Sequence, residues 1–246
     1  MAGWIDAEVV ELKQWTPRLY SIRVEADVQD FKAGQFNRLS TMLDGERVAR
    51  PYSYVNAPQD RPLDFYFITV PEGPLTNHLV TLKPGNSIQV MDKANGFFTL
   101  DELPDADVLW LFATGTALGP YLSMLRTEAP WQRFKRIVLV HAVRNAEELS
   151  YSNIIRGFQE RGEQFQFVPF VSREACDFAL PGRVPAAIES GLLEKHANLP
   201  ISADAAQVMI CGNPDMVTDT VATLKARGLT KNRRREPGQI TTENYW

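Results

Sequence analysis

The second half of the chain alternates strand-like apolar runs with helical segments, and this alternation restricts the fold more than any other feature. The apolar runs are Val108–Ala113, Ile137–His141, Phe165–Val171 and Val208–Cys211. Connecting helices are expected at Tyr121–Arg126 and Glu147–Gly162, and after Cys211 from the spacing of Met216, Val217, Val221 and Leu224. Continuous apolar strands joined by helices are typical of a parallel sheet with helices on both faces. The pattern predicts a doubly wound α/β domain.

The first half of the chain reads as short strands separated by glycine turns. Strands are expected at Leu19–Val24, Gln35–Ser40, Pro51–Val55, Leu63–Val70 and Ser87–Met91. Many short strands with such turns are typical of a small antiparallel barrel. One helix interrupts them, because Pro74 suits a first helical position and Leu75, Leu79 and Leu82 share one face.

The change of pattern indicates two domains, residues 1–100 and residues 101–246. No run approaches the ~20 apolar residues that cross a membrane, and the N-terminus lacks a signal-peptide pattern. Two cysteines, Cys176 and Cys211, are too few for a disulfide framework or a Cys₄ cluster. No metal site is predicted, and a cytoplasmic monomer is expected. The net charge of −4 argues against general nucleic-acid binding.

Two motifs of the first half could bind anions. In Arg50-Pro51-Tyr52-Ser53, strand geometry places Arg50 and Tyr52 on one face and Ser53 on the other. An ordinary strand and a ligand-binding strand are about equally compatible with these residues. Gly73-Pro74-Leu75-Thr76 opens a helix, whose free amides attract anions, although a plain capped helix has the same pattern.

Three features of the second half lie where parallel strands end, which is where ligands bind in open sheets. Gly115-Thr116-Ala117-Leu118-Gly119-Pro120 is a strand-to-helix turn, although it lacks the Gly-x-Gly-x-x-Gly spacing. Cys211-Gly212-Asn213-Pro214-Asp215-Met216 is a second such turn. Arg144, Ser172, Arg173 and Arg183 follow the intervening strands. Taken singly, each arginine could be an ordinary solvated surface residue, and Cys211 an ordinary buried cysteine.

Together, in this order and at these separations, the motifs resemble those of the ferredoxin–NADP reductase family of flavoproteins, and particularly of its bacterial ferredoxin/flavodoxin–NADP reductases. The resemblance implies an antiparallel FAD-binding β-barrel followed by an α/β NADP-binding domain with a parallel sheet. The residues implied to contact FAD are Arg50, Pro51, Tyr52, Ser53, Tyr66, Gly73, Pro74, Leu75, Thr76, Thr116, Tyr245 and Trp246. The residues implied to contact NADP are Gly115, Thr116, Arg144, Ser172, Arg173, Arg183, Gly212, Asn213 and Met216.

Within these sets the resemblance implies specific roles. Arg50 would pair with the FAD diphosphate, and the arginines after the strands would hold the 2′-phosphate of NADP. Ser53 beside flavin N5 and Cys211 near nicotinamide C4 would be the catalytic residues. The terminal aromatic, Trp246, would pack on the FAD adenine.

The activity implied by the resemblance is hydride transfer from NADPH to FAD, followed by transfer of single electrons to ferredoxin or flavodoxin. Acidic carriers would need local positive charge, for which the candidates are Arg38, Lys231, Arg233, Arg234 and Arg235. Two alternatives remain open at this point. One is an NAD(P)H-dependent reductase component of an oxygenase system, and the other is a non-enzymatic FAD-binding sensor.

Overall fold

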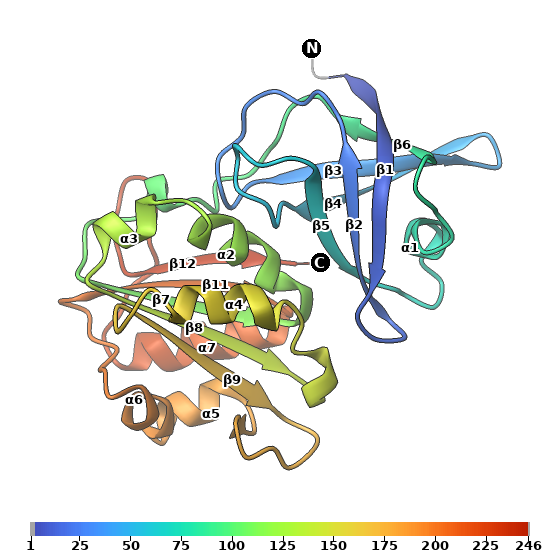
Figure 1. The fold of residues 1–246 in the computed structure, drawn as a ribbon. Coiled ribbons are helices and arrows are strands. Elements are labelled where there is room, and N and C mark those ends of the chain that lie inside the picture. Colours follow the sequence, from blue (N-terminus) through green and yellow to red (C-terminus); the bar gives the residue numbers. More distant parts are fainter. Residues whose placement is uncertain (1–2, 246) are drawn as a thin grey trace. The chain divides into compact units, whose positions relative to one another are not determined.

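The computed structural model describes residues 3–245 and divides into two compact units (Figure 1). Unit 1 comprises Met1–Thr99 and Gly119–Thr127, and unit 2 comprises Leu100–Leu118 and Glu128–Trp246. No helix among the described residues is long and apolar enough to cross a membrane.

Unit 1 is built on a curled antiparallel sheet with the strand order β4-β3-β6-β1-β2-β5. The strands are β1 (Trp4–Gln14), β2 (Leu19–Glu25), β3 (Phe36–Leu43), β4 (Glu46–Ser53), β5 (Leu63–Ile68) and β6 (Ser87–Met91). Its two edges approach one another just beyond β4, where Tyr54 forms an isolated bridge to Phe65 and the Val55 N–H donates to Asp64 O at 2.9 Å. The predicted antiparallel barrel is therefore confirmed as a half-barrel.

The long hairpin of β3 and β4 extends further than the sequence pattern suggested. It is joined by Asp44 and Gly45, whose φ angles of 50° and 82° match the two-residue turns that suit twisted hairpins. Strand β1 was not expected, and it pairs with both β2 and β6. The core of the unit includes Leu39, Tyr54 and Phe65. Helix α1 (Pro74–Leu79) begins at the predicted proline.

Unit 2 is a parallel sheet with the strand order β10-β9-β8-β7-β11-β12, in which every described pair is parallel (Figure 1). The strands are β7 (Val108–Thr114), β8 (Arg136–Val143), β9 (Phe165–Val171), β10 (Leu180–Pro181), β11 (Ala206–Gly212) and β12 (Ile240–Asn244). The helices of the second half are α2 (Leu118–Leu125), α3 (Ala129–Arg133), α4 (Ser152–Gln159), α5 (Val184–Glu189), α6 (Leu192–Ala197) and α7 (Pro214–Ala226). Single 3₁₀ turns occupy η1 (Leu100–Glu102), η2 (Gly115–Ala117) and η3 (Ala146–Glu148). The predicted parallel α/β sheet is confirmed.

Helices cover both faces of this sheet. On one face, Val184 of α5, Leu193 of α6 and Leu224 of α7 share a core with Trp110 and Phe112 of β7. On the other, Phe158 of α4 lies with its ring centroid 5.8 Å from that of Phe165 on β9.

The predicted helix over residues 147–162 is wrong in its first turn. Residues 146–148 form η3, closed by a capping box between Asn145 and Glu148. Helix α4 begins only at Ser152, after Tyr151 adopts a left-handed φ of 60°. The Glu148 carboxylate accepts the N–H groups of Arg144 at 2.8 Å and Asn145 at 3.2 Å, and so caps the start of η3 as a separate turn.

The order of strands defines a topological switch point. The chain proceeds from β7 to β8, β9 and β10 on one side, and then returns to place β11 on the other side of β7. The turns that follow β7 and β11 therefore open at the same edge of the sheet. In doubly wound folds this edge is where ligands bind.

Candidate functional site

The Arg-Pro-Tyr-Ser motif lies at the end of β4, which is an edge strand of the sheet of unit 1. Pro51 faces Arg38 across the β3–β4 ladder and is tolerated because an edge strand needs fewer backbone donors. Arg50 is exposed, and its Nη1 donates to the adjacent Ala49 O at 2.8 Å. Among the described residues it forms no ion pair with a carboxylate. Arg50 thus presents a guanidinium without an ion-pair partner, which suits it to pair with phosphate.

Tyr52 and Ser53 are both buried, on opposite faces of β4. The Tyr52 ring meets Phe67 edge-on at 6.1 Å between centroids, and burial raises the pKa of its hydroxyl to about 12 despite the nearby charge of Arg50. Ser53 is 3% exposed, and within the described residues its hydroxyl makes no hydrogen bond. The hydroxyl can therefore donate to or accept from a bound molecule. Tyr66 is also buried, on β5, opposite Ser21.

The start of α1 is a tight turn in which a side chain has no room. A Cβ on Gly73 would lie 2.8 Å from Thr76 Oγ1 and 3.0 Å from Val70 Cβ. The Thr76 hydroxyl accepts the Val70 N–H and donates to Gly73 O, both at 3.2 Å, so it braces the turn. No side chain caps the helix, and Pro74 has no N–H. The amides of Leu75 and Thr76 are therefore the groups of this turn that suit an anion.

In unit 2, the turns after β7 and β11 are joined directly. The Asn213 N–H donates to Thr114 Oγ1 at 2.9 Å, across 99 residues of sequence. Gly212 has a φ of +144°, and a Cβ there would lie 2.1 Å from Thr114 Oγ1 and 3.1 Å from Thr114 N. Only glycine permits this approach. The structure thus brings Gly115 and Thr116 to the same edge as Gly212.

The Asn213 side chain serves the protein itself. Its Oδ1 accepts the N–H groups of Asp215 at 2.9 Å and Met216 at 3.3 Å, and so caps α7. Met216 is half-buried, and its sulfur accepts the Thr220 hydroxyl at 3.4 Å. The Asn213 N–H donates to Thr114 and its carbonyl oxygen accepts the Val217 N–H at 3.0 Å, so the side-chain Nδ2 is the group of this residue that suits a ligand.

Exposed arginines gather at the ends of β8, β9 and β10. The Arg173 N–H donates to Arg144 O at 2.9 Å, so these two residues lie on adjacent turns. The Ser172 hydroxyl donates to Val143 O at 3.2 Å, and Arg183 is the residue that precedes α5. None of the three arginines forms an ion pair within residues 3–245. Three unpaired cations at the carboxyl edge of a parallel sheet suit a phosphate group.

Cys211 and Glu243 face each other across the β11–β12 ladder. Cys211 is fully buried, and burial together with the charge of Glu243 raises the pKa of its thiol well above the usual range. Burial also raises the pKa of Glu243 to about 7. Cys211 is therefore a neutral thiol, consistent with a positioning group and not with a nucleophile.

Glu243 and His141 are candidate site residues that the sequence motifs did not reveal. The segment around Glu243 reads as a tail, and only its pairing with β11 places the carboxyl beside Cys211. Tyr245 follows, with its N–H donating to Gly212 O at 3.1 Å. The assignment of Trp246 to the FAD adenine lies outside the described residues.

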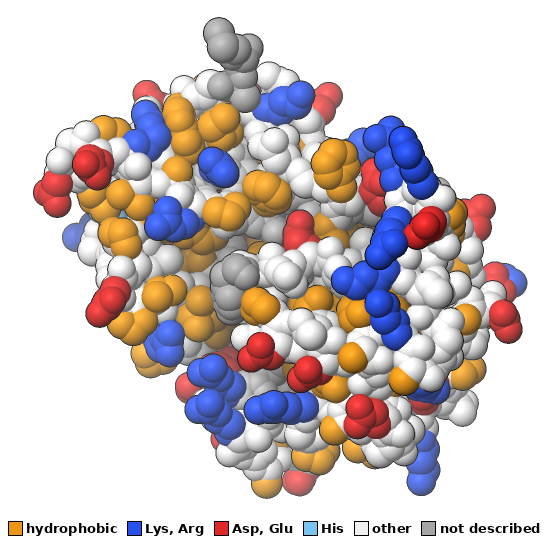
Figure 2. Space-filling view, turned by 180° about the vertical axis from the view of Figure 1, so that it is seen from behind, with side chains coloured by type: hydrophobic (Ala, Val, Ile, Leu, Met, Phe, Trp, Pro, Cys, Tyr) orange, Lys and Arg blue, Asp and Glu red, His pale blue; other side chains and the backbone are white. Residues whose placement is uncertain are grey.

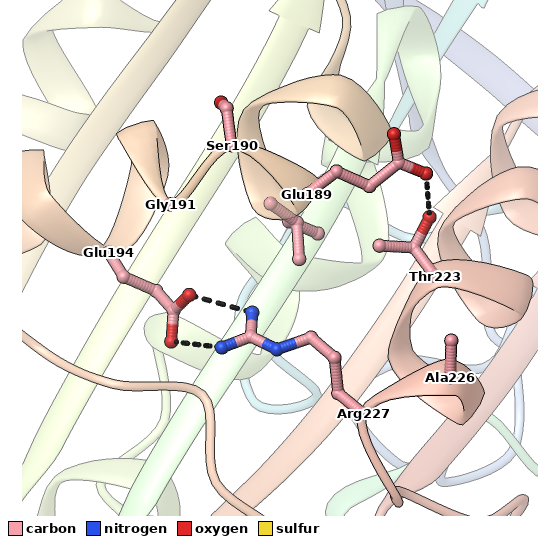
Figure 3. A pocket seen from close by; sticks show the side chains of 8 residues that line it. Glu189, Ser190, Gly191, Glu194, Thr223, Ala226 and Arg227 are labelled. Carbon is pink, nitrogen blue, oxygen red and sulfur yellow. Dashed lines mark hydrogen bonds and ion pairs between the residues drawn. The ribbon is translucent and has the colours of Figure 1, made fainter.

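A separate cleft of about 450 Å³ lies between the ends of α5, α6 and α7 (Figure 3). Arg227 closes it by pairing with Glu194, at 2.6 and 2.9 Å, and Thr223 donates to Glu189 at 3.1 Å. Burial alone would raise the pKa of Glu194, but the hydrogen bonds and charge of Arg227 lower it. Because α7 runs back from β11, Arg227 lies toward the amino ends of the strands, away from the ligand edge. This cleft contains none of the predicted site residues.

Comparison with known proteins first defines the class. Residues 10–94 match the oxidoreductase FAD-binding domain, and residues 111–222 match the oxidoreductase NAD-binding domain. These matches correspond to the half-barrel and to the parallel sheet. The protein is an oxidoreductase with an FAD-binding domain and an NAD-binding domain.

Relatives of full length define the family. The chain is 49% identical to a flavodoxin/ferredoxin–NADP reductase of Shigella flexneri and 48% identical to one of Escherichia coli K12, with 100% of both chains covered in each case. A crystal structure of a ferredoxin NADP⁺ reductase from Neisseria gonorrhoeae with bound FAD and NADP matches with a TM-score of 0.95, at 31% identity and 100% coverage of both chains. The chain belongs to the flavodoxin/ferredoxin–NADP reductase family, as its motifs predicted.

Proposed function

We propose that this protein binds FAD and NADPH and transfers electrons between NADPH and the one-electron carriers ferredoxin or flavodoxin. The observation that carries the proposal is the edge of the parallel sheet in unit 2. There the Gly115 and Gly212 turns adjoin, and three unpaired arginines follow the neighbouring strands. Residues 1–100 are proposed to hold FAD, and residues 101–246 to hold NADP.

The residues of unit 1 fit FAD. Arg50 offers a guanidinium without an ion-pair partner for a diphosphate, Ser53 a hydroxyl that makes no hydrogen bond among the described residues, and the turn at Gly73 an uncapped helix start. Tyr52 is proposed to lie against the flavin ring. The full set proposed for FAD is Arg50, Pro51, Tyr52, Ser53, Tyr66, Gly73, Pro74, Leu75, Thr76, Thr116, Tyr245 and Trp246. When bound, FAD supplies the ability to accept a hydride and to release its electrons one at a time.

The residues of unit 2 fit NADP. The amides of the turn at Gly115 suit a diphosphate, and Arg144, Arg173 and Arg183 suit the 2′-phosphate. Ser172, Gly212, Asn213 and Met216 complete the proposed contacts. The arginines favour NADP over NAD, because NAD lacks the phosphate that they would contact.

Ser53 and Cys211 are proposed to act at the reacting ends of the two cofactors. Ser53 would hold a hydrogen bond at flavin N5, where a proton and charge move during the reaction. Cys211, neutral and fully buried, would shape the position of the nicotinamide and exclude water. Neither residue needs to form a covalent bond.

Docking of the carrier is proposed to be electrostatic, although the chain carries a net charge of −4. Lys and Arg side chains nevertheless gather at several places on the surface (Figure 2), and four of them follow one another closely in the sequence at Lys231, Arg233, Arg234 and Arg235. The proposed docking residues are Arg38, Lys231, Arg233, Arg234 and Arg235. All five are exposed, and within the described part of the chain only Arg233 has an ion-pair partner, Glu236 at 3.1 Å.

Raising the salt concentration above 0.1 M, where the Debye length is ~10 Å, should weaken carrier turnover. Salt-independent turnover would contradict electrostatic docking.

One experiment tests the function as a whole. The purified protein should be yellow, and anaerobic addition of NADPH should bleach its flavin. Adding oxidised ferredoxin or flavodoxin should then restore the yellow colour and reduce the carrier. A flavin that stays oxidised with NADPH would contradict the proposal, and would favour a protein that only binds FAD.

Two further properties are proposed, the cellular compartment and the oligomeric state. Both cysteines are free, with Cys211 buried and Cys176 half-buried, which suits a reducing compartment such as the cytoplasm. A monomer is proposed as the functional unit. Sedimentation at micromolar concentration should give the mass of a single 27.8 kDa chain.

A further inference from the structure

His141 is a fully buried polar side chain in β8, directly after the apolar run of residues 137–140. Its Nε2 lies 2.9 Å from Gly115 O. A carbonyl oxygen only accepts hydrogen bonds, so the proton of the neutral ring is on Nε2. The other ring nitrogen, Nδ1, is buried and has no hydrogen-bond partner among the described residues.

This arrangement is costly for the fold alone. An unpaired buried nitrogen loses its hydration without compensation, whereas an aliphatic residue would continue the apolar pattern of Leu139 and Val140. Burial lowers the pKa of His141 to about 4, so the ring is neutral near pH 7 and contributes no charge pairing. What the histidine provides is one N–H donor aimed at one carbonyl.

That carbonyl belongs to the turn proposed to hold the NADP diphosphate. Gly115 has a left-handed φ of +52°, and the space where a Cβ would stand is open. Its oxygen accepts a second hydrogen bond, from the Leu118 N–H. Both lone pairs of the oxygen are therefore occupied. An oxygen held in this way cannot turn toward an anion, and the peptide plane of the turn is fixed.

We infer that His141 is a positioning residue for NADP(H), which holds the Gly115 carbonyl away from the diphosphate so that the amides of the turn face it. The inference rests on the proposed function, because it assumes that the nucleotide diphosphate binds at this turn. His141 acts through Gly115 and does not itself contact the nucleotide.

Two substitutions of equal length separate this role from simple packing. Gln carries an amide N–H at about the position of Nε2, whereas Met fills the same space without a donor. His141→Met also removes the unpaired nitrogen, so the variant should fold at least as well as the wild type. Melting temperature and FAD content serve as controls for both variants.

The test compares the Kd values of two ligands, NADP⁺ and adenosine 2′-monophosphate, each measured by calorimetric titration into the FAD-loaded protein. Both ligands carry the 2′-phosphate, but only NADP⁺ carries the diphosphate. We expect His141→Met to raise the Kd of NADP⁺ by about three- to tenfold, the effect of one lost hydrogen bond. The Kd of adenosine 2′-monophosphate should not change, and His141→Gln should bind both ligands like the wild type.

Each other outcome overturns the inference. Wild-type affinity of His141→Met for NADP⁺ would show that the donor has no role. Equal weakening of both ligands, or equal behaviour of the Gln and Met variants, would show a general packing role. These results leave the proposed function intact, which fails separately if the wild-type protein does not bind NADP⁺ at all.

Discussion

Replacing Gly212 by alanine should destabilise unit 2 strongly, because two penalties coincide at this residue. The φ of +144° is one that residues with a Cβ rarely adopt, which costs about 1–3 kcal/mol. The new Cβ would also lie 2.1 Å from Thr114 Oγ1, so the Thr114 side chain must move and release its hydrogen bond from the Asn213 N–H. That loss adds about 1 kcal/mol. The expected loss of stability is about 3 kcal/mol, or a fall in Tm of roughly 6–12 °C for a protein of this size.

A matched control separates strain from collision. Gly228 also has a positive φ, +90°, but a Cβ there would meet nothing within 4 Å. Gly228→Ala should therefore show strain alone, about 1 kcal/mol. Thr114→Ala combined with Gly212→Ala should cost less than the sum of the two single variants, because it removes the colliding oxygen. Differential scanning calorimetry at fixed FAD compares the wild type with these three single variants and the double variant. A loss in Gly212→Ala no greater than in Gly228→Ala would refute the close approach of the two turns.

Three further predictions concern the cofactors and the half-buried carboxyl of Glu243. Arg50→Ala should purify with substoichiometric FAD, since a charge-assisted contact of about 1.5–3 kcal/mol is lost; full occupancy and unchanged affinity would remove Arg50 from the site. Ser53→Ala should keep its FAD but slow anaerobic flavin reduction by NADPH at least about tenfold in stopped flow, and an unaltered rate would refute its role at N5. The pKa of Glu243 is raised to about 7 in the folded protein, so its ionisation lowers stability as the pH rises from about 4.5 through 7. Glu243→Gln should therefore gain in Tm over the wild type between pH 5 and pH 8, whereas a difference independent of pH would contradict the burial of this carboxyl.

The parts of the fold that could be predicted are those with a local signal. The strand β7 (Val108–Thr114) could be predicted because a continuous run of apolar residues must be buried on both faces, as in the middle of a parallel sheet. This signal is contained in the run itself. The strand β12, at Ile240–Asn244, has no such signal, since its sequence is mostly polar. It is a strand because β11 offers a free edge, which is a property of distant residues. The two-residue strand β10 has the same origin.

The site divides in the same way. The glycines of the two turns could be predicted, because tight strand-to-helix turns restrict the residue type locally. The bond between Thr114 and Asn213 could not, because it joins residues that only the sheet order brings together. Glu243 was missed for the same reason. The role of His141 could not be predicted either, because its hydrogen-bond partner is the backbone oxygen of Gly115, in the turn after another strand. In the sequence it follows an apolar run and reads as an ordinary strand residue.

The most direct test of the central claim is the choice between NADPH and NADH. Two arginine–phosphate contacts, each worth about 1.5–3 kcal/mol at most when partly exposed, predict a preference for NADPH of roughly 100-fold or more in kcat/KM. Alanine at both Arg144 and Arg173 should erase most of that preference by raising the KM for NADPH, while NADH kinetics change little because NADH lacks the phosphate. A wild-type protein with equal kcat/KM for NADH and NADPH would contradict the account.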